Sequence, residues 1–319
     1  MRAIPLLTLL IGGWFIVPAH ADEAQDWLNR LSHAEQQQSF QGTFVYERNG
    51  SFSTHSIWHR VQDGKVRERL LQLDGSAQEA VRVDGRTQCV SGTLVAGLGD
   101  TSGSSARALD PQKLKNWYDL AVIGKSRVAG RAAVIVSLTP RDQHRYGFEL
   151  HLDRETGLPL KSLLLNDKGQ LLERFQFTRL DTTDVPTERD LQASAECKAV
   201  VLDSDKASAV KTPQAWYSDW LPPGFELISS NARMDPDTKA QVNSLMYDDG
   251  LARFSVFLEP LNGAVVTDTR TQLGPTVAVS RRLTTPEGEM MVTVVGEIPI
   301  GTAERIALSM RADTTAAKQ

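Results

Sequence analysis

The chain of 319 residues contains only two cysteines, Cys89 and Cys197, which lie far apart in the sequence. This spacing excludes the Cys-x-x-Cys pair on which zinc ribbons and dithiol redox sites depend. In an oxidising compartment an even pair of cysteines allows a disulfide. Two separate buried thiols would fit the sequence equally well, because the sequence does not give the distance between the two Cα atoms.

Enzymatic signatures are also missing. The sequence has no Gly-x-Ser-x-Gly elbow, no phosphate-binding loop and no dinucleotide fingerprint after a strand. Asp142, His144 and Glu149 place an acid and a base close together, and Ser137 is nearby in the sequence. Charged surface segments of this kind are common, so we expect no catalytic triad. We therefore expect a protein that is not an enzyme and has no catalytic residue.

His55 and His59 come nearest to a metal-binding pair. They lie in a segment with the alternation of a strand, where four residues span ~13 Å. That separation is too large for two ligands of one metal ion. We expect both histidines to face solvent, and we expect neither a metal ion nor another cofactor.

A strong charge imbalance is absent as well. The formal net charge is −4, which does not favour nucleic acid as a partner. The one long apolar run, residues 4–17, follows Arg2 and precedes the small residues that end at Ala21. It is shorter than the ~20 apolar residues of a membrane-spanning helix. Residues 1–21 are therefore predicted to be a secretory signal peptide that is cleaved after Ala21.

The remaining chain is typical of two domains. Residues 22–39 carry apolar side chains at helical spacing, and residues 40–180 alternate with the period of a strand. Asn-Gly and Asp-Gly pairs punctuate this alternation, which predicts an antiparallel meander of roughly nine to eleven strands. The Gly- and Ser-rich residues 97–106 are predicted to form a mobile loop. The predicted divisions are a first domain at 22–195, a linker at 196–212, a smaller α+β domain at 213–312, and a disordered tail at 313–319.

Aromatic side chains concentrate in two places. Seven lie on predicted strands of the first domain: Phe44, Tyr46, Trp58, Tyr146, Phe148, Phe175 and Phe177. They form either a packed core or the lining of a cavity, since a curled sheet of ~10 strands can hold one small apolar ligand. Their spacing alone favours the core. Trp216, Trp220 and Phe225 open the second domain next to two prolines, and both an interface and simple packing fit this pattern.

Several longer segments are informative in combination. They include SFQGTFVYERNG (39–50), TPRDQHRYGFELHLDRETGLPLKS (139–162), WLPPGF (220–225) and DGLARFSVFLEP (249–260). Through these runs, which occur in the expected order, the chain resembles the MucB/RseB family along nearly all of its mature length. The sequence of residues 44–60 is similar to that of the MucB branch of the family.

The resemblance implies a fold that is mainly β with α+β. The N-terminal domain would be a large unclosed antiparallel β-barrel with a long helix, similar to lipoprotein carriers, and the C-terminal domain would be smaller and α+β. Members are periplasmic negative regulators of envelope stress, and in the MucB branch they regulate alginate biosynthesis. They bind the periplasmic segment of a transmembrane anti-sigma factor (MucA or RseA) and protect it from site-1 proteolysis. Lipopolysaccharide or another acyl lipid releases them.

On this basis the seven aromatic residues of the first domain are candidates for lipid binding. Trp216, Trp220 and Phe225 are candidates for binding the anti-sigma partner. A periplasmic lipid or lipoprotein carrier is the alternative, and an envelope hydrolase is a third and weaker one. The sequence leaves open whether the chain forms a homodimer and which lipid it binds.

Overall fold

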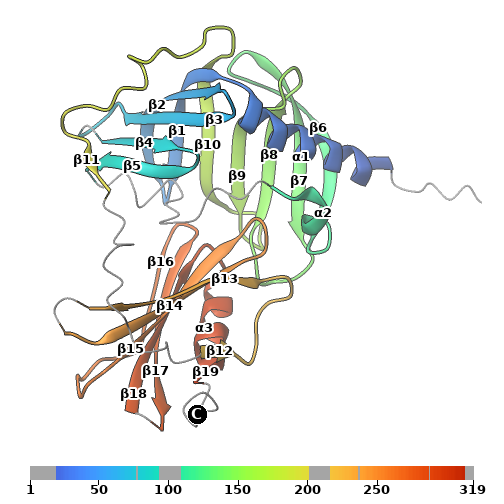
Figure 1. Cartoon of the computed structure of the whole chain (residues 1–319). Helices are drawn as coiled ribbons and strands as arrows, with labels where there is room; N and C mark the ends of the chain where they lie inside the picture. Colours follow the sequence, from blue (N-terminus) through green and yellow to red (C-terminus); the bar gives the residue numbers. More distant parts are fainter. Residues whose placement is uncertain are drawn as a thin grey trace, which may run out of the picture.

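The computed structural model describes residues 19–76, 78–92, 109–200, 216–235, 238–286 and 288–312. Residues 1–18 of the predicted signal peptide, the predicted loop at 97–106, residues 201–212 of the predicted linker and the tail at 313–319 lie outside the described residues. The described chain forms two large antiparallel sheets that lie end to end (Figure 1). The expected fold class, mainly β with α+β, is confirmed.

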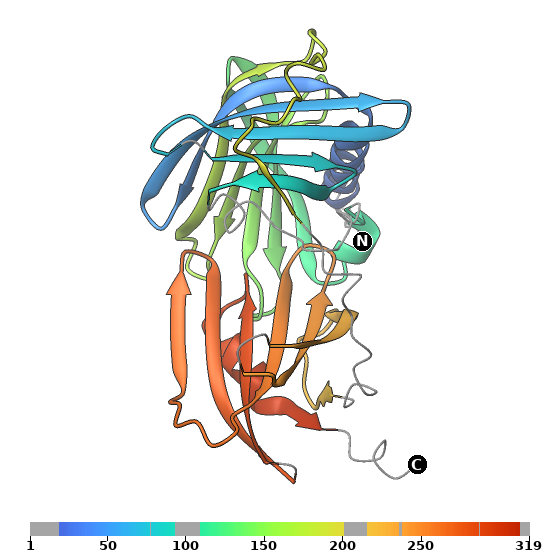
Figure 2. The same ribbon diagram turned by 60° about the vertical axis from the view of Figure 1, so that its left-hand side comes forward.

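The larger sheet follows one long helix, α1 (Ala19–Gln37). Its eleven strands lie in the order β11-β5-β4-β3-β2-β1-β10-β9-β8-β7-β6, so it is open at β11 and at β6. The sheet curls without closing, as the turned view in Figure 2 shows. The strands are β1 (Phe40–Arg48), β2 (Ser51–Gln62), β3 (Lys65–Gln72), β4 (Glu79–Val83), β5 (Arg86–Ser91), β6 (Tyr118–Val128), β7 (Arg131–Pro140), β8 (Gly147–Asp153), β9 (Pro159–Leu165), β10 (Leu171–Asp181) and β11 (Lys198–Ala199). A short helix, α2 (Pro111–Leu114), precedes β6.

Two hairpins show why the meander forms where the sequence predicts it. Asn49 and Gly50 have φ values of 51° and 74°, and Asp63 and Gly64 have φ values of 52° and 72°. Two successive residues with positive φ make the primed turn that matches the twist of the flanking strands. At the far edge β6 pairs with β7, and a bulge between Val122 and Gly124 interrupts their ladder.

Helix α1 packs on the larger sheet through one apolar stripe. Ala24, Leu28 and Leu31 are buried and belong to a core cluster with residues of β6, β7 and β8. Their spacing of four and three residues places them on one side of the helix. The helix ends at Gln37, two residues before the predicted end. Ser39 lies between the helix and β1, and its hydroxyl accepts a hydrogen bond from the Val61 N–H at 3.0 Å.

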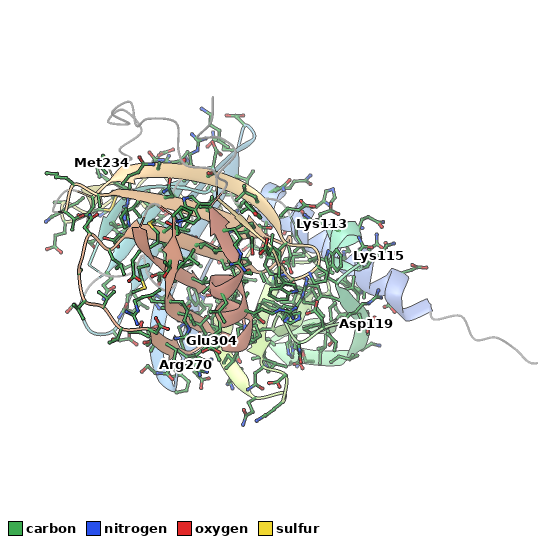
Figure 3. The ribbon with its side chains drawn as sticks, turned by 90° about the horizontal axis from the view of Figure 1, so that it is seen from below. Lys113, Lys115, Asp119, Met234, Arg270 and Glu304 are labelled. Carbon is green, nitrogen blue, oxygen red and sulfur yellow. A yellow bond between two sulfur atoms is a disulfide. The ribbon has the colours of Figure 1, made fainter. Side chains whose placement is uncertain are left out.

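The smaller sheet has the order β13-β14-β15-β18-β17-β16. Its strands are β13 (Glu226–Met234), β14 (Gln241–Asp248), β15 (Arg253–Pro260), β16 (Thr269–Leu273), β17 (Thr276–Thr285) and β18 (Gly288–Gly296). Helix α3 (Ile300–Ser309) covers one face, and β12 (Trp216–Ser218) pairs with β19 (Met310–Ala312) beside it. Figure 3 shows Glu304 of α3 close to Arg270 of β16, and their side chains are 3.3 Å apart. The alternation of the sequence does not predict β16, because four of its five residues are polar and all five are exposed.

Residues 182–200 form a strap across β3, β4 and β5. Arg69 donates a hydrogen bond to the Asp190 carbonyl at 3.1 Å, and Glu79 accepts one from the Ser194 N–H at 3.1 Å. A disulfide joins Cys89 of β5 to Cys197, with their Cα atoms 5.4 Å apart. The strap then ends in β11, which pairs with β5 and falls inside the predicted linker. Residues 182–200, which precede the second domain in the chain, are therefore held on the larger sheet.

Candidate ligand-binding face and domain interface

The inner face of the larger sheet carries a cluster of aromatic rings. In the register of β1 with β10, Phe44 lies opposite Phe177 and Tyr46 lies opposite Phe175, so all four side chains share one face. Ring centroids are 4.6 Å apart for Phe44 and Phe175 and 5.0 Å apart for Phe175 and Phe177. Gly42 makes room for this packing, because a Cβ there would lie 2.8 Å from the Phe177 ring. We call these four residues the aromatic cluster.

Two histidines extend the aromatic cluster along β2. His55 stacks on Phe44 with centroids 5.1 Å apart, and His59 stacks on Phe40 at 4.6 Å. Their exposed fractions are 2% and 4%, so the expectation that they face solvent is wrong. Hydrogen bonds make their burial tolerable, since His59 Nδ1 lies 2.9 Å from a carboxylate oxygen of Glu68. Burial lowers the pKa of His55 and favours its neutral form.

A polar group closes one end of the aromatic cluster. The Tyr46 hydroxyl donates a hydrogen bond of 2.6 Å to the Glu173 Oε2 atom. Burial raises the pKa of Glu173 to about 7. Arg48, two residues after Tyr46, lies with its Nε atom 3.7 Å from the same oxygen. A carboxylate, a phenol and a guanidinium thus meet at the edge of an otherwise apolar surface.

The remaining predicted lipid-binding residues lie apart from the aromatic cluster. Trp58 is paired with Gln41 on the opposite face of the sheet, and the Arg69 guanidinium lies 5.1 Å from its ring. Phe148 shares the inner face but packs in the cluster beneath α1. Tyr146 is buried at the contact between the two sheets, where its hydroxyl donates to the Ile298 carbonyl at 3.1 Å. Lipid binding by these residues stays a prediction, and for Trp58 it would require a ligand on the other face.

The three aromatic residues that open the second domain are packed inward. Trp216 and Phe225 are 7% and 6% exposed and belong to the core of the smaller sheet. Trp220 lies between the Arg305 guanidinium, 3.8 Å from its ring, and the His144 ring at 5.0 Å. Their assignment to the partner surface stays a prediction, and it would require this packing to open.

The interface between the sheets is built around Arg145, which lies in a segment predicted to be a charged part of the surface. Its side chain is fully buried and donates a hydrogen bond of 2.7 Å to Asp249, which lies in the turn between β14 and β15. The Asp249 side chain is also fully buried. The rings of Trp117 and Phe225 lie 5.6 and 5.2 Å from the guanidinium. Gly224 fits against this group, because a Cβ there would lie 2.2 Å from the Trp117 ring. Asp142, three residues earlier, is the local partner of Arg145, but the contact that makes it an interface residue is with Asp249, 104 residues away.

The residues considered for a catalytic triad have separate hydrogen-bonding partners. These are Arg145 for Asp142 (3.0 Å), Thr302 for His144 (3.1 Å), His151 for Glu149 (2.8 Å) and Thr139 for Ser137 (3.3 Å). These contacts do not join the residues considered for the triad to one another. His151, however, also lies with Nδ1 2.6 Å from the Ser126 hydroxyl, so Ser126, His151 and Glu149 form one hydrogen-bonded row. Within the described ranges, no three His, Cys, Asp or Glu side chains gather as metal ligands would.

Comparison with known proteins accounts for both sheets. The MucB/RseB N-terminal domain matches residues 23–196, and the MucB/RseB C-terminal domain matches residues 210–311. The chain belongs to the MucB/RseB family. Over 320 aligned residues, covering all of both chains, it is 64% identical to the sigma factor AlgU regulatory protein MucB of Pseudomonas aeruginosa. It is 27% identical to the sigma-E factor regulatory protein RseB of Haemophilus influenzae, over 98% of this chain and 99% of that one.

Solved structures of MucB show the same architecture. The complex of Pseudomonas aeruginosa MucA and MucB matches with a TM-score of 0.82 at 64% identity, covering 92% of this chain and 100% of that one. Another crystal structure of MucB matches with a TM-score of 0.68 at 61% identity, covering 92% of this chain and 98% of that one. The family is one of regulatory proteins, by the names of these relatives. In the part of the chain that the structure describes, no helix combines the length and the apolar character needed to cross a membrane.

Proposed function

We propose that this protein is a regulator that binds the periplasmic segment of a transmembrane anti-sigma factor and protects that segment from site-1 proteolysis. The observation that carries the proposal is the 64% identity to MucB over the full length of both chains. The match to a solved complex of MucB with MucA supports the nature of the partner. The names of these relatives describe regulators of sigma factors, which fits the proposed role.

The periplasm is the proposed location. The predicted signal peptide supports export, and the Cys89–Cys197 disulfide fits an oxidising compartment. A disulfide of this kind would be reduced in a cytosol rich in glutathione and thioredoxin. The anti-sigma segment with which the protein would associate lies on the same side of the membrane.

Residues 213–312 and the adjoining interface are the proposed docking region for the anti-sigma segment. The outer edges of the smaller sheet are β13 and β16, and each pairs with one neighbour among the described strands. All five residues of β16 are exposed. An extended peptide can add a strand to such an edge, and its backbone is then hydrogen-bonded. Because a protease needs an extended and accessible backbone, pairing of this kind would protect the segment.

Residues 22–195 are the proposed lipid-responsive domain, with the aromatic cluster as the surface that an acyl chain contacts. Each methylene group removed from water contributes about 0.8 kcal/mol. Several buried methylenes therefore supply enough free energy to shift a conformational equilibrium. Release of the partner follows only if the lipid prefers the arrangement that binds the partner poorly, because a ligand with equal affinity for both arrangements shifts nothing.

The proposal is tested by protection of the anti-sigma periplasmic segment in a purified system. The segment is incubated with its site-1 protease and the full chain, with and without lipopolysaccharide. We expect the full chain to slow cleavage, and we expect lipopolysaccharide to restore it. Cleavage at the same rate with and without the chain would contradict the proposed function.

A lipid or lipoprotein carrier is the second candidate, and the aromatic cluster is the observation that favours it. A carrier moves lipid between vesicles and needs no anti-sigma segment. Transfer of a fluorescent lipid between donor and acceptor vesicles, measured on the full chain, separates the two functions. Transfer without any protection of the segment would support the carrier.

A further inference from the structure

Arg48 connects the two sheets at the end of β1. Its guanidinium donates to Thr276 Oγ1 and lies 3.3 Å from Glu297 Oε1, and both of these residues belong to the second domain. Its side chain is 14% exposed. The turn that contains Gly274 rests on it, because a Cβ at Gly274 would lie 2.8 Å from Arg48 Cγ. Arg48 is therefore a direct link from β1 to the smaller sheet.

The same residue adjoins the aromatic cluster through Glu173. The Glu173 Oε2 atom accepts the hydrogen bond of the Tyr46 hydroxyl, and it lies 3.7 Å from Arg48 Nε. That Nε atom is buried and has no hydrogen-bond partner in the structure. A buried donor without an acceptor is unfavourable. Among the described residues, Arg48 thus has an unused donor beside an oxygen that already accepts a hydrogen bond from Tyr46 and lies too far away to accept one from Arg48.

The Arg48 contact differs in strength from the contact around Arg145. In the larger sheet β1 and β8 are separated by β10 and β9, so the two contacts hold the smaller sheet at different points. Arg145 and Asp249 are both inaccessible to solvent, whereas the Glu297 side chain is 48% exposed. Exposed ion pairs contribute little and break easily, while removing one partner of a buried pair is strongly unfavourable. We therefore expect the Arg145–Asp249 contact to stay intact and the Arg48 contact with the smaller sheet to break first.

Structures of MucB also differ in how well they match this chain. Two structures that contain MucB with MucA have TM-scores of 0.82 and 0.79, at 64% and 63% identity. Another crystal structure of MucB has a TM-score of 0.68 at 61% identity, with the same 92% of this chain covered. Structures of nearly equal identity and equal coverage thus superpose on this chain to different degrees.

We propose that Tyr46, Glu173 and Arg48 form a relay that couples acyl-chain binding at the aromatic cluster to the orientation of the second domain. An acyl chain that enters beside the Tyr46 ring moves its hydroxyl away from Glu173. Arg48 then turns its free Nε to the vacated oxygen and releases Thr276 and Glu297. The smaller sheet turns about the Arg145–Asp249 contact. This relay rests on the proposed lipid response and specifies the residues that transmit it.

The relay is tested by Tyr46→Phe, which removes the hydroxyl and keeps the ring, and by Arg48→Gln. Arg174→Gln is the matched control, because Arg174 pairs with Glu47 within the larger sheet at 3.3 Å. Cysteines at the exposed positions Lys168 and Asn262, one in each domain, carry spin labels on the full chain. Electron paramagnetic resonance then gives the distance distribution between the domains, with and without sodium myristate. Fluorescence displacement measures myristate binding separately.

In the wild-type chain we expect myristate to shift the distance distribution. In Tyr46→Phe and Arg48→Gln the shifted distribution should be present without myristate, and in Arg174→Gln it should not. If both relay variants retain the wild-type distribution while their folds are intact, the relay is wrong, whether or not myristate binds. If the wild-type chain binds no acyl probe, the lipid response fails, and the ligand-driven step of the relay fails with it.

Discussion

Arg145 and Asp249 form an ion pair across the two sheets, with 2.7 Å between the guanidinium Nη1 and the carboxylate Oδ2, and neither side chain reaches solvent. Two charges in such a place stabilise the protein only as a pair. If Arg145 is removed, the Asp249 carboxylate remains buried without this counter-ion, and if Asp249 is removed, Arg145 keeps only Asp142, whose side chain is 23% exposed. The contact therefore makes the stability of the two sheets interdependent.

Asp249→Asn should lower the free energy of unfolding, by up to about 3–5 kcal/mol, because it removes the fully buried one of the two carboxylates that pair with Arg145 and leaves only Asp142. Urea denaturation followed by circular dichroism measures this loss. The control is Arg141→Ala, which removes an ion pair with Asp119 whose side chains are 51% and 68% exposed. That change should stay within about 1 kcal/mol. Equal losses in the two variants would contradict the role assigned to the buried pair.

Glu173→Gln should change how stability depends on pH. Burial raises the pKa of Glu173 from 4.5 to about 7, so the folded chain binds this proton more tightly than the unfolded chain does. The resulting stabilisation is complete below pH ~4.5 and is lost as the pH rises through about 7. Between pH 6 and pH 8 the wild-type chain should therefore lose about 1 kcal/mol relative to the variant. Urea denaturation at both pH values tests this, and an equal change in the two proteins would contradict it.

Removal of the disulfide should destabilise the larger sheet. The Cys89–Cys197 bridge spans 108 residues, and a loop of this size contributes roughly 4–5 kcal/mol in the chain-entropy model. The double variant Cys89→Ala, Cys197→Ala should lose about 2–5 kcal/mol in urea denaturation. Wild-type protein treated with a strong reductant serves as the comparison, and its free energy of unfolding should fall by a similar amount. An unchanged midpoint in both samples would show that the strap stays in place without the bridge.

A charge on the inner face should abolish acyl binding, whereas one on the outer face should not. Phe175 belongs to the aromatic cluster and is half-buried, so Phe175→Asp would place a carboxylate where the chain would dock. Trp58→Asp is the control on the opposite face. Displacement of a fluorescent fatty acid should fall at least tenfold in the first variant and stay within about twofold in the second, since burying an unpaired charge is unfavourable. The reverse result would place the ligand on the outer face.

The fold was largely accessible from the sequence, because Asn-Gly and Asp-Gly pairs mark the hairpins from β1 to β5 and regular alternation marks the strands of the larger sheet. The limits appear where a polar residue is buried. His55 and His59 alternate in phase with Ile57, and their position on the inner face is compatible with burial only because ring stacking and the Glu68 contact compensate for it. Local patterns do not reveal such partners.

The functional sites were less accessible for the same reason. Arg145 depends on a turn of the second domain, and Arg48 depends on Thr276 and Glu297, which follow it by more than 200 residues. Trp58 was grouped with Phe44 because both lie on neighbouring strands, but the register places the two side chains on opposite faces. A shift of one residue in register reverses every side chain of a strand, and composition does not determine it.

The two edge strands of the larger sheet affect whether the protein aggregates at high concentration. An open barrel leaves unpaired backbone N–H and C=O groups along its edge strands, and another copy of the chain could add a strand there. Here one edge is β11, which has only two residues, and the other is β6, which is bulged at Ile123 and carries Lys125 and Arg127. Short, charged or irregular edges are poor templates for growth of a fibre. The larger sheet can therefore stay open to a ligand and still resist edge-to-edge association with another copy of the chain.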